Sequence, residues 1–163
     1  MKKILLALSF LFLLSGQISA KARVDKEVKI FTTSYKKAIV TTKNGKKVIK
    51  WLKPTKVIPK DTIKYVNTIV NNSNKALENV RIVNKIDKNV DYIPNSASSK
   101  VNFSVRYSVD NAKSFHPAKE LFIVDKKGKK RLAQAKDYNA IEFVIPKVLP
   151  HSKINLSYQV KIK

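Results

Sequence analysis

Apolar and polar residues alternate along most of this chain. The alternation is regular at 101–109, 141–145 and 154–162, and at 80–86 it is interrupted by Asn84 at an inward position. Because successive side chains of a β-strand point to opposite faces, a period of two predicts strands with one buried face. The sequence contains no convincing amphipathic helix, so the chain is expected to be all-β.

Turn signals lie between the alternating segments. Asn44-Gly45 separates two apolar stretches and predicts a hairpin with a type I′ turn, in which both central residues have positive φ. Gly128 is expected to mark a similar turn, and all six prolines fall between alternating runs, where a missing N–H costs no ladder hydrogen bond. The count predicts seven to nine short antiparallel strands, which favours an immunoglobulin-like β-sandwich over a barrel.

Two residues do not fit the simple pattern. Asn67 is in phase with the inward residue Ile69, so it either forms hydrogen bonds inside the sandwich or marks a bulge that shifts the register. Trp51 lies in an apolar strand and is expected in the core. The alternative is that Trp51, Tyr35 and Tyr65 line a platform for carbohydrate.

Residues 1–22 have the pattern of a secretory signal peptide. Two lysines precede an eleven-residue apolar run at 4–14, and small and polar residues follow up to an expected cleavage site after Ala20 or Ala22. The run is shorter than the ~20 residues of a membrane-spanning helix. We therefore expect export to the periplasm or the cell exterior, no transmembrane segment after cleavage, and a single sandwich domain over 23–163.

The chain is strongly basic, with 34 Lys and Arg against 11 Asp and Glu and a net charge of +23. Only four of these residues are Arg, whereas proteins that bind phosphate through paired hydrogen bonds favour Arg. Asn and Ile are also frequent, and the codons of Lys, Asn and Ile are rich in A and T, so genome composition is a second explanation. No specific nucleic-acid site is expected, but salt-sensitive attraction to polyanions is.

Two basic clusters are expected at hairpin tips. They are candidate contacts for an anionic surface polysaccharide or extracellular nucleic acid, although lysines at such places also protect sheet edges from aggregation. The residues concerned are Lys43, Lys46, Lys47, Lys126, Lys127, Lys129, Lys130 and Arg131.

The residue inventory argues against catalysis. The chain has no Cys, which excludes disulfides, thiolate zinc sites and a cysteine nucleophile. Its two histidines, His116 and His151, each adjoin a proline in an expected loop, and no phosphate-binding or dinucleotide-binding motif is present. We expect no enzyme activity, no cofactor and no metal. A hydrolase would need a pocket that joins one histidine to a carboxylate and a hydroxyl.

Several motifs resemble the bacterial conserved-repeat domain, also called domain of unknown function eleven, in its exported single-domain form. The family pattern has a P-G-D-T turn, a strand that ends in N-x-G, and a Y-x-P-G-S turn, which 59–62, 69–72 and 92–96 resemble. Lys60 and His151 stand where the pattern has turn glycines. The resemblance implies an immunoglobulin-like sandwich in exported, often surface-related or adhesion-related proteins, and it carries no catalytic residues.

Residues 108–115 also resemble an Asp-box, S-x-D-x-G-x-T-W, in degenerate form. An Asp-box is a structural hairpin whose Asp side chain caps the N–H groups of the turn. Asp110 is therefore predicted to have a structural role in a turn, together with Asn44, Gly45 and Gly128.

The expected function is that of an exported, non-catalytic module that acts through contact with another protein or with the cell envelope. An open sandwich has edge strands that can pair with a strand of a partner. The alternative is a cationic binder of anionic polysaccharide or extracellular nucleic acid. Salt separates the two, because polyanion binding weakens steeply with ionic strength whereas strand pairing responds little.

Overall fold

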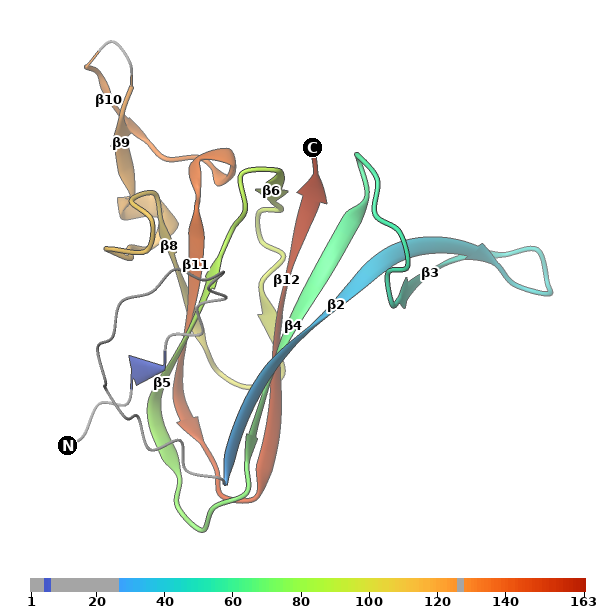
Figure 1. Ribbon diagram of the computed structural model, residues 1–163, viewed down its shortest axis with the longest axis horizontal. Coiled ribbons are helices and arrows are strands. Elements are labelled where there is room, and N and C mark those ends of the chain that lie inside the picture. The colour runs from blue at the N-terminus through green and yellow to red at the C-terminus, as the bar shows by residue number, and fades with distance from the viewer. Residues whose placement is uncertain (1–4, 7–26, 126–127) are drawn as a thin grey trace, which may run out of the picture.

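The structure is a computed structural model that describes residues 5–6, 27–125 and 128–163. Over these residues it consists of strands and two 3₁₀ turns of three residues each, η1 Ala118–Glu120 and η2 Ala135–Asp137. The strands form antiparallel sheets that face each other as in a sandwich (Figure 1), which confirms the predicted all-β sandwich architecture. The expected signal peptide lies outside the described residues, except for two of them that form β1.

The larger sheet has the strand order β3-β2-β4-β12-β6, and β7 also pairs with β12. Its longest members, β2, β4 and β12, have continuous antiparallel registers. The strands are β2 Val28–Thr41, β3 Lys47–Leu52, β4 Thr62–Asn71, β6 Val90–Tyr92, β7 Ser98–Ser99 and β12 Ser152–Ile162.

The second sheet has the order β1-β5-β11-β8, and β9 and β10 form a separate hairpin. Only β1 departs from the antiparallel prediction among the described strands, because it pairs in parallel with β5. Seven strands of five residues or more match the predicted number, and five strands of two or three residues are too short to show a period. The remaining strands are β1 Leu5–Leu6, β5 Leu77–Lys85, β8 Ser104–Ser108, β9 Phe122–Val124, β10 Lys130–Leu132 and β11 Ala140–Val148.

The core lies between the two sheets and follows the predicted alternation. On β11 and β12 every inward apolar side chain of the alternating runs is buried, apart from the partly buried Ile162 at the end of β12. Aromatic rings link the layers: Tyr92 and Tyr107 lie with ring centroids 5.2 Å apart, and their hydroxyl oxygens are 3.0 Å apart. The alternation therefore predicted correctly which face of these strands is buried.

Asn67 forms a hydrogen bond inside the sandwich, which is the first of the two explanations expected for it. The register of β4 against β12 is continuous from Thr62 to Asn71, so the strand has no bulge. The Asn67 side chain is 1% exposed, and its Oδ1 accepts a hydrogen bond of 2.7 Å from the Thr32 hydroxyl on β2. The polar residue is thus part of the inner face.

The β2–β3 turn differs from the predicted type I′ turn. The Thr42 N–H donates to Lys46 O (2.8 Å) and the Gly45 N–H donates to Thr42 O (2.9 Å), which makes a three-residue loop. Gly45 has φ of 74°, but Asn44 does not have positive φ. The type I′ prediction was wrong because the loop includes Lys43, and three-residue loops end on a single left-handed residue.

The β9–β10 turn repeats this arrangement. The Asp125 N–H donates to Lys129 O and the Gly128 N–H donates to Asp125 O, both at 3.0 Å. Gly128 has φ of 77°. Both glycines therefore mark hairpin turns, as predicted.

Several non-glycine residues of the sandwich lie in the left-handed region, and three of them are in turns that resemble the conserved-repeat pattern. Lys60, Asn95 and His151 have φ of 74°, 58° and 51°. Each stands where the conserved-repeat pattern has glycine. The backbone therefore has the conformation that glycine would favour at these positions, whereas membership of the family remains a prediction.

Candidate functional site

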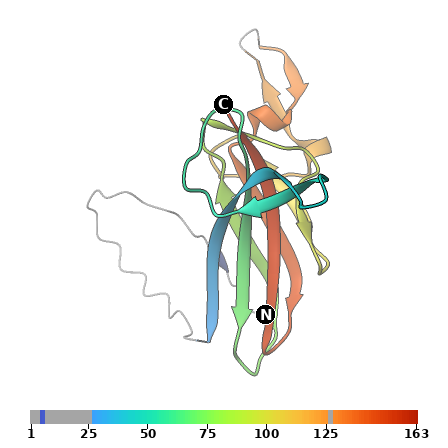
Figure 2. The same cartoon turned by 90° about the vertical axis from the view of Figure 1, so that its right-hand side faces the viewer.

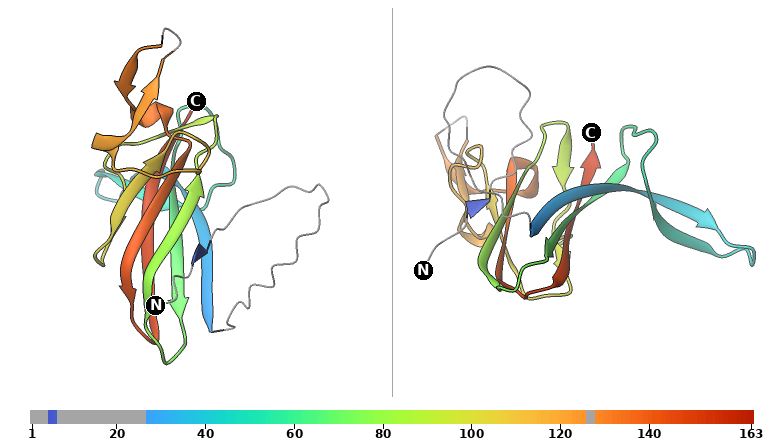
Figure 3. Two further views of the ribbon diagram at one scale, coloured as in Figure 1. Left: turned by 90° about the vertical axis from the view of Figure 1, so that its left-hand side faces the viewer. Right: turned by 60° about the horizontal axis from the view of Figure 1, so that its bottom comes forward.

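Part of β2 leaves the sandwich. Its first half pairs with β4 from Val28 to Lys36, and its second half pairs only with β3, from Lys36 to Thr41. Residues 36–52 therefore form a two-stranded projection, here called the arm, which extends away from both layers (Figures 1 and 3). The arm has no second layer to cover either of its faces.

Large apolar side chains are exposed on the arm. Ile39 and Ile49 are opposite each other in the β2–β3 pair and are 70% and 57% exposed. Leu52 is also exposed, and the Lys64 Nζ lies 4.3 Å from the ring centroid of the half-buried Trp51. A cation above an aromatic ring is favourable, but most of this apolar surface has no cover from its own chain.

The prediction that Trp51 lies in the core is wrong. Trp51 is opposite Lys37 in the arm, beyond the reach of the second sheet. Tyr65 packs against the core and stacks on Tyr158 with 5.3 Å between ring centroids. Because Tyr65 faces inward, it does not form one platform with Trp51 and Tyr35.

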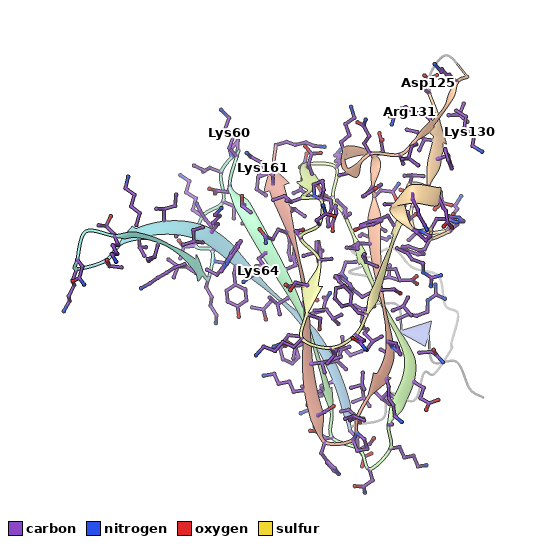
Figure 4. The ribbon with its side chains drawn as sticks, turned by 180° about the vertical axis from the view of Figure 1, so that it is seen from behind. Lys60, Lys64, Asp125, Lys130, Arg131 and Lys161 are labelled. Atoms are coloured by element: carbon purple, nitrogen blue, oxygen red, sulfur yellow. The ribbon has the colours of Figure 1, made fainter. Side chains whose placement is uncertain are left out.

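The predicted basic contacts are divided between two projections. Lys43, Lys46 and Lys47 lie at the tip of the arm. Lys129, Lys130 and Arg131 lie in the β9–β10 hairpin, on the other side of the molecule (Figure 4). Lys126 and Lys127 lie outside the described residues. The structure therefore does not bring the predicted lysines together into one patch.

All three arginines in the described residues are in ion pairs with carboxylates. Arg131 donates to both carboxylate oxygens of Asp137, at 2.7 and 2.9 Å. Arg81 and Arg106 both pair with Glu142 on β11, the latter at 2.7 Å, and Glu142 is completely buried. The guanidinium groups are thus engaged within the chain, and the cationic surface is essentially lysine.

A groove lies along one side of the sandwich. On this side, β2 is the outer long strand of the larger sheet and β5 is the outer long strand of the second sheet. The groove has a volume of about 740 Å³. Its floor and walls are mostly apolar, and the exposed residues Lys85 and Asp87 lie at its rim. Its lining includes Ile30, Thr32, Tyr65, Asn67, Ile82, Val83, Asn84, Ile86 and Tyr158.

Two amide groups face this groove without partners. The Nδ2 atoms of Asn67 and Asn84 are buried and make no hydrogen bond with any described residue. Burial raises the pKa of the Tyr158 hydroxyl. Burial also raises the pKa of the Tyr65 hydroxyl, and the negative charge of Asp87 raises it further by a smaller amount. Both phenols are therefore neutral at physiological pH, and the interior of the groove is uncharged but polar at two points.

The sequence analysis did not predict this groove. The sequence contains one indication of the groove. Asn67 and Asn84, the two asparagines at predicted inward positions of apolar strands, both line it. They belong to strands of different sheets, β4 and β5. Two inward asparagines in otherwise apolar strands were thus the available signal of a common polar site.

Both histidines lie away from the groove. His116 is exposed, and its backbone pairs with Tyr107. His151 is also exposed, and its Nε2 lies 2.8 Å from Asn74 Oδ1. Neither residue lines the groove. Among the described residues there is also no cluster of three His, Asp or Glu side chains that would hold a metal ion.

Asp110 has the contacts expected of an Asp-box aspartate. Its Oδ1 accepts hydrogen bonds from the Ser108 hydroxyl (2.6 Å) and from the N–H groups of Lys113 and Ser114, and its Oδ2 accepts one from the Ser114 hydroxyl. These bonds, the one from Ser108 above all, hold the pKa of the carboxyl well below its ordinary value. Asp110 thus caps the loop after β8.

In the part of the chain that the structure describes, neither 3₁₀ turn approaches the length or the apolar character of a membrane-crossing helix. Comparison of the chain with protein-family models, with curated proteins and with solved structures gives no match.

Proposed function

We propose that the protein is an exported, non-catalytic module that binds another protein through the arm. The observation that carries this proposal is the exposure of the paired residues Ile39 and Ile49 on one face of a projection that contributes nothing to the core. Contiguous apolar surface exposed to water is costly to solubility and marks interaction sites. The signal-peptide pattern supports export, and the left-handed turns at glycine positions of the conserved-repeat pattern support an immunoglobulin-like sandwich.

The arm also offers a backbone edge. Among the described strands, β3 pairs only with β2, which leaves its other edge unpaired along residues 47–52. A partner strand added there would gain main-chain hydrogen bonds and cover the isoleucines. Lys43, Lys46 and Lys47 lie at the tip, beyond this apolar middle, so charged groups border the apolar surface at one end, as at the rim of a protein interface.

The lysines support the alternative function, a cationic binder of anionic polymer. The tips of both projections carry exposed lysines, Lys43 and Lys46 on the arm and Lys129 on the β9–β10 hairpin. The arginines argue against this alternative, because all three described ones already pair with carboxylates. Recognition of phosphate or sulfate would therefore depend on lysines without paired hydrogen bonds.

The test captures partners from cell-envelope extract at about 0.05 and 0.3 M NaCl. One variant removes the apolar surface, Ile39→Ser with Ile49→Ser, and the matched variant removes charge, Lys43→Gln with Lys46→Gln. We expect the first to lose its protein partner at both salt concentrations and the second to keep it. Loss only in the lysine variant, with release at the higher salt, would instead establish the polyanion alternative.

A further inference from the structure

We propose that the groove between β2 and β5 is a second binding site, separate from the arm, and that it takes an extended peptide strand of a partner protein. The strand would lie along the free edge of β5. Apolar side chains at alternate positions would enter the groove, and its peptide groups would bond to the amides of Asn67 and Asn84.

Among the described residues, β2 and β5 are the long strands at the side of the two sheets where the groove lies (Figures 2 and 3). In the larger sheet, β2 has β4 on one side, but β3 begins only opposite Lys36, so residues 28–35 form an edge. In the second sheet, β5 pairs with β11 along its length, whereas on its other side only Arg81 and Ile82 are paired, with β1. Within residues 27–125 and 128–163, no strand pairs with this side of either sheet over most of its height.

The backbone of β5 presents hydrogen-bonding groups to this side. The Ile86 N–H donates to Asn139 O next to β11, at 2.9 Å. Backbone groups of successive strand residues point to opposite edges, so those of Lys85 and Val83 point away from β11. The pairing of β1 with β5 shows that this edge has the geometry to accept a strand. Residues 83–85 line the groove and lie beyond the two paired residues.

The chemistry of the groove favours a peptide over a hydrocarbon. Its volume of about 740 Å³ is in the range of ligand pockets, roughly 300–1,000 Å³, and its walls of Ile30, Ile82 and Ile86 suit aliphatic side chains. A purely apolar ligand would leave the buried Nδ2 groups of Asn67 and Asn84 without hydrogen bonds, which is unfavourable. A peptide group both donates and accepts, so it matches a side-chain amide in either orientation.

The experiment selects binders from a library of random peptides of roughly ten residues, long enough to contain a strand of ~5–6 residues, on the immobilised protein. We expect the enriched peptides to have apolar residues at alternate positions. On addition of an enriched peptide, the amides of Val83 and Lys85 should become protected from hydrogen exchange. A selection without enrichment, or enriched peptides without alternation, would overturn the proposal.

A matched pair of variants tests the strand geometry. Lys85→Pro removes the edge N–H but no bond to β11, and proline is tolerated on edge strands, whereas Lys85→Ala removes only the side chain. We expect about tenfold weaker binding for Lys85→Pro, the effect of losing one hydrogen bond, and unchanged binding for Lys85→Ala. Equal binding by both variants would contradict pairing along β5.

A third variant gives a readout besides binding. Asn84→Leu replaces the inward amide by an apolar side chain, so it should weaken the selected peptides while it raises the melting temperature of the free protein. The arm variant, Ile39→Ser with Ile49→Ser, should bind the same peptides normally. Loss of peptide binding in the arm variant would assign the peptides to the arm instead of the groove.

Discussion

The strands of both the sandwich and the arm contain large apolar residues, but only the sandwich buries them. On β12, Leu156 and Val160 are at most 1% exposed, whereas Ile39 and Ile49 of the arm are more than half exposed. The difference is the second sheet, which covers the inner face of β12 and does not reach the arm. Apolar side chains of a strand are therefore buried only where a second layer faces the strand.

The two regions should also differ in how they contribute to stability. Residues of β11 and β12 contact both sheets, so they open only when the whole domain unfolds. The arm has only its own ladder and exposed side chains, so it can open locally. The predictions below test this contrast with pairs of substitutions.

The largest expected difference is between Phe143→Ala on β11 and Ile49→Ala in the arm. Phe143 is completely buried, with the rings of Phe103 and Tyr158 around it at 5.8 and 6.2 Å. Its truncation should cost about 3–5 kcal/mol of unfolding free energy, and that of Ile49 no more than ~0.5 kcal/mol. Urea denaturation measures both. A comparable loss at Ile49 would mean that the arm is covered in solution.

The second comparison concerns ion pairs. Glu142 is buried beneath Arg81 and Arg106, whose side chains are about one-third exposed. Glu142→Gln leaves the two guanidinium groups without a full counter-charge. Because the arginines are partly exposed to water, we expect the free energy of unfolding to fall by about 2 kcal/mol. Asp137→Asn breaks the more exposed pair with Arg131 and should cost less than ~1 kcal/mol.

The same denaturation experiment decides this comparison, with Asp137→Asn as the matched charge-removing control. Both substitutions keep the shape of the side chain, so packing changes little. If Glu142→Gln were as mild as Asp137→Asn, solvent would screen the Glu142 cluster despite its burial.

Local pattern was enough to predict the sandwich strands. Alternation at 141–145 and 154–162 identified the inner faces because those strands have a facing layer. The position of Trp51 was not predictable in this way, because its local sequence resembles a core strand and its exposure depends on the absence of the second sheet. The turn type was missed because one additional loop residue, Lys43, changes the conformation at Asn44.

The candidate sites were predictable only in part. Hairpin signals placed lysines at the tips of two projections, but the distance between the projections is a property of the tertiary fold. The groove depends on how two sheets distant in sequence come together, with Asn67 on one and Asn84 on the other. No feature of the local sequence connects these two residues. Only the assembled sheets bring the two polar side chains to the same groove.

A smaller effect is expected at the turns. Lys60 has φ of 74° in the turn that leads into β4, and its side chain points outward (Figure 4). Lys60→Gly should relieve backbone strain and raise the unfolding free energy by about 0.5–1 kcal/mol, after the greater entropy of glycine in the unfolded chain is subtracted. Lys56→Gly, also in an exposed loop but without positive φ, is the control.

In the arm, the corresponding substitution has the opposite sign. Gly45 has φ of 74°, and a Cβ there would meet no atom within 4 Å, so Gly45→Ala adds backbone strain without a clash. We expect faster hydrogen exchange in the arm with little change in global unfolding. A large drop in global stability would show that the arm and the sandwich unfold as one unit.

The smallest effects concern two aspartates, one at the foot of the arm and one in a loop of the sandwich. The hydrogen bond from Lys36 is the main cause that lowers the pKa of Asp61, and the ion pair measures 2.7 Å. The pKa of Asp110 is lowered mainly by the hydroxyls of Ser108 and Ser114, which carry no charge. Salt should therefore act differently on the two carboxyls.

About 1 M NaCl shortens the screening length to ~3 Å. In an NMR titration of the carboxyl carbons, this salt should raise the pKa of Asp61 toward its ordinary value of 3.8 and leave that of Asp110 low. A carboxyl with a lowered folded pKa stabilises the protein above its unfolded pKa and loses that contribution as pH falls through the folded value. Above about pH 4, where both carboxyls contribute fully, high salt should thus remove the advantage of wild type over Asp61→Asn but preserve that over Asp110→Asn. Equal salt responses would mean that charge pairing does not distinguish the foot of the arm from the sandwich loop.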